Sequence, residues 1–185
     1  AGLIDGDGYA QGGDALVAAF SREDGEPVWQ TRLTDNAGLW EDALGLTLYQ
    51  DKLYAVGSGA GSSFDLYVWC LDLEGNLLWT LPFGGEGSES GRSIVATEGG
   101  LYIGLNSSSE GAGGTDLGIL KVNLDGQQAE RTLLWGGSGT EEVHDLVLQQ
   151  GRAFLAGQSN SIGAGKEDGV LLNIDPDTEQ ILSIP

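Results

Sequence analysis

Four aspartates are the residues whose type and spacing most suggest a site. Asp14, Asp65, Asp116 and Asp168 each open an apolar run, at spacings of 51, 51 and 52 residues. Carboxylates at a fixed repeat position can converge on one cation, or each can accept backbone N–H groups from the preceding loop. Because all four copies use the aspartate alike, we favour the structural role. We expect Asp116→Ala to cost about 1–2 kcal/mol of stability.

A second acidic group stands near the start, in the run Asp5-Gly6-Asp7-Gly8. Alternate aspartates separated by glycine can direct their oxygens to a hard cation such as Ca²⁺. The run lacks the later bidentate glutamate of a full calcium loop, and the equivalent loops of the other copies carry serine and glycine instead. Asp5 and Asp7 are therefore a candidate calcium site, and an ordinary glycine-rich turn is the alternative. No other cofactor is predicted.

The remaining reactive side chains do not form a catalytic set. His144 is the only histidine, which excludes a hydrolytic triad or a multi-histidine metal site within this sequence. Its repeat position holds Leu44 and Arg92 in other copies, so the position makes no constant chemical demand. Cys70 is the only cysteine and has no basic neighbour in sequence to activate it. No phosphate-binding loop, dinucleotide fingerprint or nucleophile elbow is present.

Among the five tryptophans, one is a candidate ligand contact. Trp29 and Trp79 occupy the same repeat position, so we expect them to pack between repeats. Trp40 lies in the one irregular connection and is the aromatic side chain best placed to stack on a sugar ring.

The elements that position these residues form a tandem all-β repeat of about 50 residues. After each aspartate come an apolar strand, an Asp-Gly type turn (Asp24-Gly25, Glu74-Gly75, Asp125-Gly126), and a second strand. A glycine-rich connection, two further strands and a Gly/Ser loop complete the unit. Four short antiparallel strands repeated without helices predict a β-propeller of four-stranded blades, and a β-solenoid is the competing architecture. We expect essentially no helix.

The repeat positions divide the chain into about three and a half units. We expect the tail and loop of a preceding blade at 1–13, blades at 14–64, 65–115 and 116–167, and the first two strands of another at 168–185. Three complete units do not close a propeller ring. The remaining blades are expected from the same longer chain or from another chain.

Composition narrows the class of partner. Eight basic against 28 acidic residues give a formal net charge of −20, which disfavours nucleic acid and anionic membrane surfaces. No apolar stretch approaches the length of a membrane span, so membrane insertion is not predicted. Glycine supplies 32 of the 185 residues, as expected for short strands joined by tight turns.

The opening aspartate, Asp-Gly turn, tryptophan and Gly-Gly-x-Gly element together resemble the seven-bladed β-propeller (SBBP-type) repeat family. The match is best over Asp65–Thr115, and the first copy departs from it because Thr34–Trp40 lacks the Gly-Gly element. "FSREDGEPVWQ" (Phe20–Gln30) and "NIDPDTEQIL" (Asn173–Leu182) also resemble quinoprotein-type blades, but the threonine-glycine pair of those blades is absent. The SBBP resemblance implies a bacterial or archaeal surface or secreted protein, hence an extracellular, cell-surface or periplasmic location.

The sequence therefore predicts a non-enzymatic propeller module, a binding or structural scaffold whose loops contact protein or glycan. The alternative is a fragment of a propeller enzyme, quinoprotein-like or hydrolytic, whose active residues lie outside this segment. A purely structural assembly of open edges into a ring or polymer is a third hypothesis.

Overall fold

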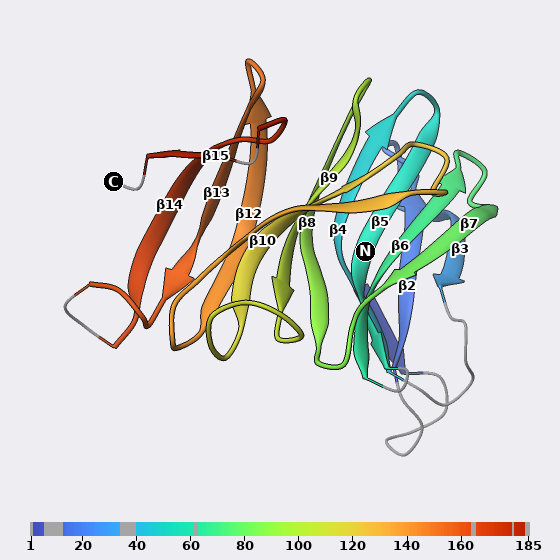
Figure 1. Ribbon diagram of the computed structural model, residues 1–185. Helices are drawn as coiled ribbons and strands as arrows, with labels where there is room; N and C mark the ends of the chain where they lie inside the picture. The colour runs from blue at the N-terminus through green and yellow to red at the C-terminus, as the bar shows by residue number, and fades with distance from the viewer. Residues whose placement is uncertain are drawn as a thin grey trace.

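The fold is all-β and consists of four antiparallel sheets arranged side by side like blades (Figure 1). The computed structural model describes residues 2–5, 13–33, 40–60, 63–163, 166–178 and 180–183. None of these residues is helical, as the sequence predicts. Over the same ranges, no helix is present that is long and apolar enough to cross a membrane.

Each sheet is a simple up-and-down meander in which consecutive strands are hydrogen-bonded neighbours. The first sheet has three described strands, β1 (Gly2–Asp5), β2 (Gly13–Phe20) and β3 (Pro27–Leu33). The second has β4 (Glu41–Tyr49), β5 (Lys52–Ala60), β6 (Phe64–Asp72) and β7 (Leu77–Phe83). The third has β8 (Glu89–Thr97), β9 (Gly100–Ser107), β10 (Asp116–Val122) and β11 (Ala129–Trp135). The fourth has β12 (Glu141–Gln149), β13 (Arg152–Ser159), β14 (Asp168–Asp175) and β15 (Gln180–Ser183).

The sheets are offset from the sequence units at 14–64, 65–115 and 116–167. The second sheet runs from Glu41 to Phe83, so it joins the second half of one unit to the first half of the next. The chain passes between sheets in the glycine-rich connections, whereas the repeat aspartates open the third strand of each complete sheet. Aligning the repeat copies with one another determines the length of the repeat, but it does not determine the residue at which one sheet ends and the next begins.

An apolar cluster fills each space between neighbouring sheets, so the two middle sheets are buried on both faces. Strand β6 shows how alternation achieves this. Leu66, Val68 and Cys70 join the cluster with the third sheet, and Tyr67, Trp69 and Leu71 join the cluster with the first. Successive side chains of a strand point to opposite faces, so a continuous apolar run is what such a strand requires.

The hairpin glycines are required both by backbone conformation and by packing. Gly75 and Gly126 have φ of 84° and 70°, which disfavours any residue with a Cβ. Each also supports a tryptophan of the preceding sheet. A side chain at Gly75 would overlap the ring of Trp29, and one at Gly126 the ring of Trp79. Trp29 Nε1 also donates to Leu73 O over 2.9 Å. These two tryptophans therefore join neighbouring sheets, as their shared repeat position predicts.

The thiol of Cys70 lies in the cluster between the second and third sheets, fully buried beside Tyr54. Burial raises the pKa of the Cys70 thiol. The pKa of Tyr54 is raised to about 12, mainly by burial and to a smaller extent by the electrostatic effect of the neighbouring Cys70. The thiolate is the reactive form of cysteine. We expect the Cys70 thiol of the native chain not to react with Ellman's reagent near neutral pH. In urea, the unfolded chain is expected to react and to release one equivalent of thionitrobenzoate from the reagent. Rapid labelling without denaturant would contradict this packing.

Candidate site at the innermost strands

The edge strands β4, β8 and β12 lie closest to one another, and the sheets diverge from them. Strand β8 contacts both β4 and β12, and Figure 1 shows these three strands in the middle of the molecule, with β14 and β15 toward one side and β7 toward the other. In a propeller the innermost strands of the blades surround the axis, where ligands bind. The side chains that these strands present are therefore the candidates for a functional site.

Every innermost strand carries a β-bulge at the same position. The register shifts between Ala43 and Gly45 in β4, between Gly91 and Ser93 in β8, and between Val143 and Asp145 in β12. The bulged residues are Leu44, Arg92 and His144, and all three are exposed. A bulge redirects a side chain and is common near functional sites. One repeated backbone feature therefore presents three chemically different side chains.

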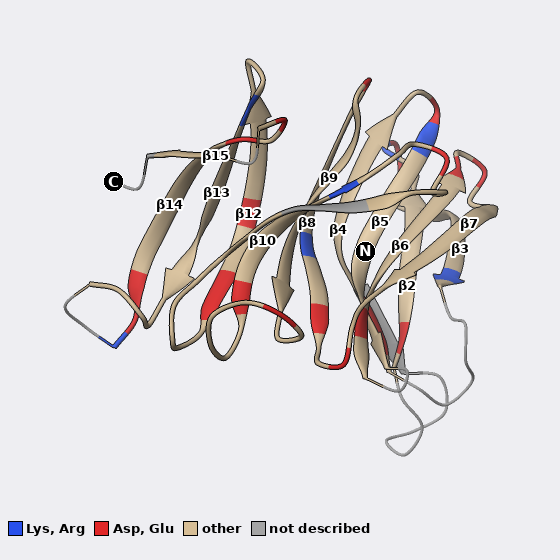
Figure 2. Cartoon of the chain, viewed as in Figure 1, with Lys and Arg blue, Asp and Glu red and all other residues tan. Residues whose placement is uncertain are grey.

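A cavity of about 240 Å³ lies at one end of these strands and draws its lining from three sheets. Among the described residues, its lining has one basic side chain, two carboxylates, an aromatic ring and several hydroxyl or amide groups. Its lining residues are Ser58, Phe64, Ser88, Glu89, Ser90, Arg92, Asn106, Ser108, Thr115 and Glu142. Figure 2 shows acidic segments at the lower ends of β8, β10, β12 and β14, with a basic segment above the acidic one on β8.

A buried glutamate at the first position of each innermost strand organises this end of the molecule. Glu41, Glu89 and Glu141 are 3%, 2% and 0% exposed. In the third sheet, Glu89 Oε2 accepts from Gly85 N at 2.8 Å. Glu89 Oε1 accepts from Ser107 Oγ at 2.7 Å and from Ser109 N at 3.3 Å. One carboxylate thus ties the glycine-rich connection to the end of β9.

The fourth sheet repeats this arrangement. Glu141 Oε2 accepts from Gly137 N at 2.7 Å, and Glu141 Oε1 accepts from Ser159 Oγ at 2.7 Å. Ser161 Oγ accepts from Gly139 N at 2.8 Å and so holds the same glycine-rich connection from the other side. Sequence analysis missed these glutamates. The signal was present, since a glutamate follows Gly-Gly-x-Gly-Ser/Thr in both copies, but glutamate is ordinarily an exposed residue.

The departure of the first copy from the repeat has a physical reason in this network. Its connection lacks the Gly-Gly element, and Gly59-Ala60-Gly61 stands where the later copies have Ser-x-Ser. In the later copies, serine hydroxyl groups accept hydrogen bonds from the N–H groups of the glycine-rich connection. The first copy lacks both the serines and the Gly-Gly element, so donors and acceptors are absent together. Trp40 takes the place of Ser88, since Trp40 O accepts from Ala60 N at 2.8 Å and Ser88 O from Ser108 N at 2.9 Å.

The hydrogen bonds to Glu141 make the stability of the folded chain decrease at acid pH. Burial opposes ionisation of Glu141, but hydrogen bonds from Ser161, Ser159 and Gly137 outweigh it and hold the pKa below its usual 4.5. A lowered pKa contributes stability above pH 4.5, and that stability is lost as the pH falls through the lowered value. We expect Glu141→Gln to be less stable than the natural chain near pH 7, with the difference shrinking as the pH falls below 4.5. Urea unfolding of both proteins across this range measures it, and a difference independent of pH would contradict the assignment.

The four repeat aspartates lie on separate sheets, in β2, β6, β10 and β14. Asp14 pairs with Arg32 at 3.2 Å, Asp65 Oδ1 accepts from Ser63 Oγ at 2.8 Å, and Asp116 Oδ2 accepts from Ala112 N at 3.0 Å. Within the described ranges, no three His, Cys, Asp or Glu side chains form a group that could hold a metal ion.

The calcium hypothesis for Asp5 and Asp7 falls largely outside the described residues. Asp7 is not described, and for Asp5 only the backbone is placed, opposite Gly13 in β1 and β2. Trp40 is described, is 39% exposed, and has its ring centre 5.9 Å from that of Phe64 in an edge-to-face arrangement. Phe64 lines the cavity described above, so Trp40 lies just behind that wall.

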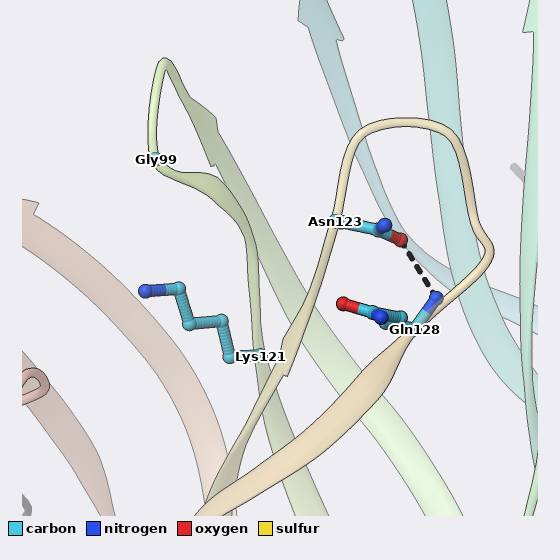
Figure 3. Close-up of a pocket in the computed structure, with 4 residues that line it drawn as sticks. All are labelled: Gly99, Lys121, Asn123 and Gln128. Carbon is cyan, nitrogen blue, oxygen red and sulfur yellow. Dashed lines mark hydrogen bonds between the residues drawn. The ribbon is translucent and has the colours of Figure 1, made fainter.

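A second, smaller cavity of about 170 Å³ lies beside the β10–β11 hairpin (Figure 3). It is lined by Gly99, Lys121, Asn123 and Gln128. Asn123 Oδ1 accepts from Gln128 N at 2.9 Å, which closes the turn. Lys121 Nζ lies 3.8 Å from Asp177 Oδ1 and 5.3 Å from the centre of the Tyr102 ring. Lys121 and Asn123 thus already have partners, so the cavity of about 240 Å³ at the ends of the innermost strands is the better candidate site.

Comparison with known proteins supports the propeller architecture. No family model and no curated protein sequence matches this chain. Among solved structures, two single-substitution mutants of the Synechocystis apocarotenoid oxygenase are similar, each at 13% identity and a TM-score of 0.53. A chimera of that oxygenase with RPE65 is similar at 14% identity and a TM-score of 0.51. Each comparison covers 95% of this chain and 44% of the other, so the chain spans less than half of these propeller proteins.

The prediction of a non-enzymatic scaffold is contradicted by these comparisons. The similar structures are oxygenases, which favours the alternative that the chain is a fragment of a propeller enzyme. The prediction failed because it treated the absence of a catalytic set in one segment as evidence against catalysis. At 13% identity the likeness itself establishes the fold. The comparisons support a propeller fold, and they do not show that the chain belongs to the SBBP-type repeat family.

Proposed function

We propose that this chain supplies consecutive blades of a larger propeller enzyme and forms part of the wall of its central channel. The observation that carries the proposal is the alignment of 95% of the chain with 44% of an oxygenase of the propeller fold. The bulges of β4, β8 and β12 support it, because they present Leu44, Arg92 and His144 on the innermost strands.

In this proposal the blades contribute positioning and binding groups rather than a whole active site. His144 is exposed and is the single imidazole in the sequence, so a metal centre built from several histidines would need ligands from other blades. Arg92 offers charge-assisted hydrogen bonds, and Leu44 offers apolar surface. Different blades of one ring can thus supply different parts of one site.

The test is turnover by the natural protein that contains this chain, with an apocarotenoid and dissolved oxygen as the first probe. We expect cleavage products by mass spectrometry, and lower turnover when His144 is replaced by alanine. Arg22→Ala, in the exposed β2–β3 hairpin, is the control and is expected to leave turnover unchanged. A folded protein whose activity is the same in the His144 variant would contradict a channel role for these blades.

We also propose the finer assignment to the SBBP-type repeat, with an extracytoplasmic location. The Asp-Gly turns, the packing of Trp29 and Trp79 and the Gly-Gly-x-Gly connections support it, since each has a defined structural use. Immunological detection of the natural protein in cell fractions tests the location.

A further inference from the structure

Two opposite charges line the cavity of about 240 Å³ at the ends of the innermost strands, and they do not pair with each other. Arg92 projects from the bulge of β8 and Glu142 lies on β12, and both belong to the lining. Neither side chain makes an ion pair with any described residue. Glu89 also lines the cavity, but its oxygens already accept from Gly85 and Ser107. In a chain of net charge −20, an arginine that has no ionic partner among the described residues leaves its donors available to a ligand.

The walls that hold these charges are fixed by hydrogen bonds between elements. Asn106 Oδ1 accepts from Val143 N at 2.8 Å and so joins the third sheet to the fourth. Ser108 Oγ accepts from Ser88 N at 2.8 Å and holds the connection that enters β8. A site whose walls are fixed before binding loses less entropy when a ligand enters. The geometry is therefore that of a preformed cavity.

One side of the cavity is apolar. Phe64 is 43% exposed, and the ring of Trp40 packs edge-on against it. An exposed aromatic pair of this kind offers a flat surface for an aliphatic or aromatic group. The cavity therefore combines a cation, an anion and an apolar face within about 240 Å³.

We propose that this cavity binds a free α-amino acid with an apolar side chain. The ligand carboxylate meets Arg92, its ammonium group meets Glu142, and its side chain contacts Phe64. A purely anionic ligand fits less well, because it would bring a third carboxylate beside Glu89 and Glu142. A neutral sugar would leave both charges without ionic partners. The inference is independent of the proposed enzyme activity, since it concerns binding alone.

The test is calorimetric titration of the full chain with L-phenylalanine as the probe. For so small a ligand we expect a Kd of roughly millimolar order. Two analogues identify the recognised groups: N-acetyl-phenylalanine lacks the ammonium charge, and phenylalanine amide lacks the carboxylate. Both are expected to bind at least about tenfold more weakly, because each loses one charge-assisted contact.

Variants with matched controls assign the contacts to residues. Arg92→Gln and Glu142→Gln are expected to weaken binding about tenfold each. Arg22→Gln and Glu98→Gln make the same changes on exposed hairpins and are expected to have no effect. Melting curves check that every variant is folded. The proposal is overturned if a chain with a cooperative melting transition shows no saturable binding, if the two analogues bind as tightly as phenylalanine, or if Arg92→Gln binds it unchanged.

Discussion

Replacing Glu141 by alanine is expected to lower the free energy of unfolding by about 3 kcal/mol or more. The side chain is 0% exposed and accepts hydrogen bonds from Gly137 N and Ser159 Oγ, with a further bond from Ser161. Truncation would leave the buried Ser159 Oγ and the half-buried Gly137 N without this acceptor, and an unsatisfied buried donor costs about 1–3 kcal/mol. For a chain of this size, the melting temperature would fall by roughly 6–12 °C.

The neighbouring residue provides a matched control. Glu142 follows Glu141 on β12 but is only half-buried and takes no part in the hydrogen bonds to the glycine-rich connection. Glu142→Ala should therefore change the melting temperature little. Equal losses for the two variants, measured by thermal unfolding of the chain, would show that the buried network does not stabilise the junction between the third and fourth sheets.

Gly57→Ala is expected to cost about 3 kcal/mol, because the strand pair at the bulge leaves no space for a side chain. A Cβ at this position would overlap the backbone oxygen of Asp42 on the partner strand. Backbone atoms of a paired strand cannot move aside as a flexible side chain can. The fourth sheet has the same restriction, since a Cβ at Gly157 would overlap Glu142 O.

Gly169→Ala is the control for this substitution. Gly169 is also a strand glycine, but it is exposed and a Cβ there would meet nothing within 4 Å. The change should be neutral or slightly stabilising, by up to about 0.5 kcal/mol, since alanine restricts the unfolded chain. Denaturant unfolding of both variants measures the contrast. A small loss at Gly57 would mean that the bulge in β4 is more open than the structure shows.

Each bulge pairs one glycine with a larger residue on the partner strand. The register pairs are Ala43 with Gly57, Gly91 with Leu105 and Val143 with Gly157, so each pair contains one glycine. In the third sheet the glycine has moved to the other strand, where a Cβ at Gly91 would overlap Val56 of the second sheet. Close packing thus requires the small residue for two different reasons: the paired backbone at Gly57 and Gly157, and the neighbouring sheet at Gly91.

The sequence predicts the local elements well because their signals are local. The Asp-Gly turns mark the hairpins, and the shared position of Trp29 and Trp79 marks the contact between sheets. The apolar run of β6 indicates burial on both faces. The limits of each sheet were not predictable, because the same period fits any cutting point. Glu89 and Glu141 were missed since their burial depends on Ser107 and Ser159, 18 residues away, which donate to them only in the folded sheet.

The candidate site was predictable only in part. Trp40 stood out because it interrupts the repeat, and it lies beside Phe64 at the edge of the cavity. The sequence assigns no role to His144, because its repeat position holds Leu44 and Arg92 in other copies. The structure leads to the opposite interpretation. The same backbone bulge occurs in each of these strands and presents a different exposed side chain each time, so individual blades can differ in chemistry at this position.

The most direct test of the central claim is an experimental structure of the natural protein that contains this chain. We predict a closed ring of four-stranded blades in which β4, β8 and β12 surround the axis and Leu44, Arg92 and His144 face the channel. A structure in which β7, β11 and β15 line the axis, or in which the sheets stack without closing a ring, would contradict it.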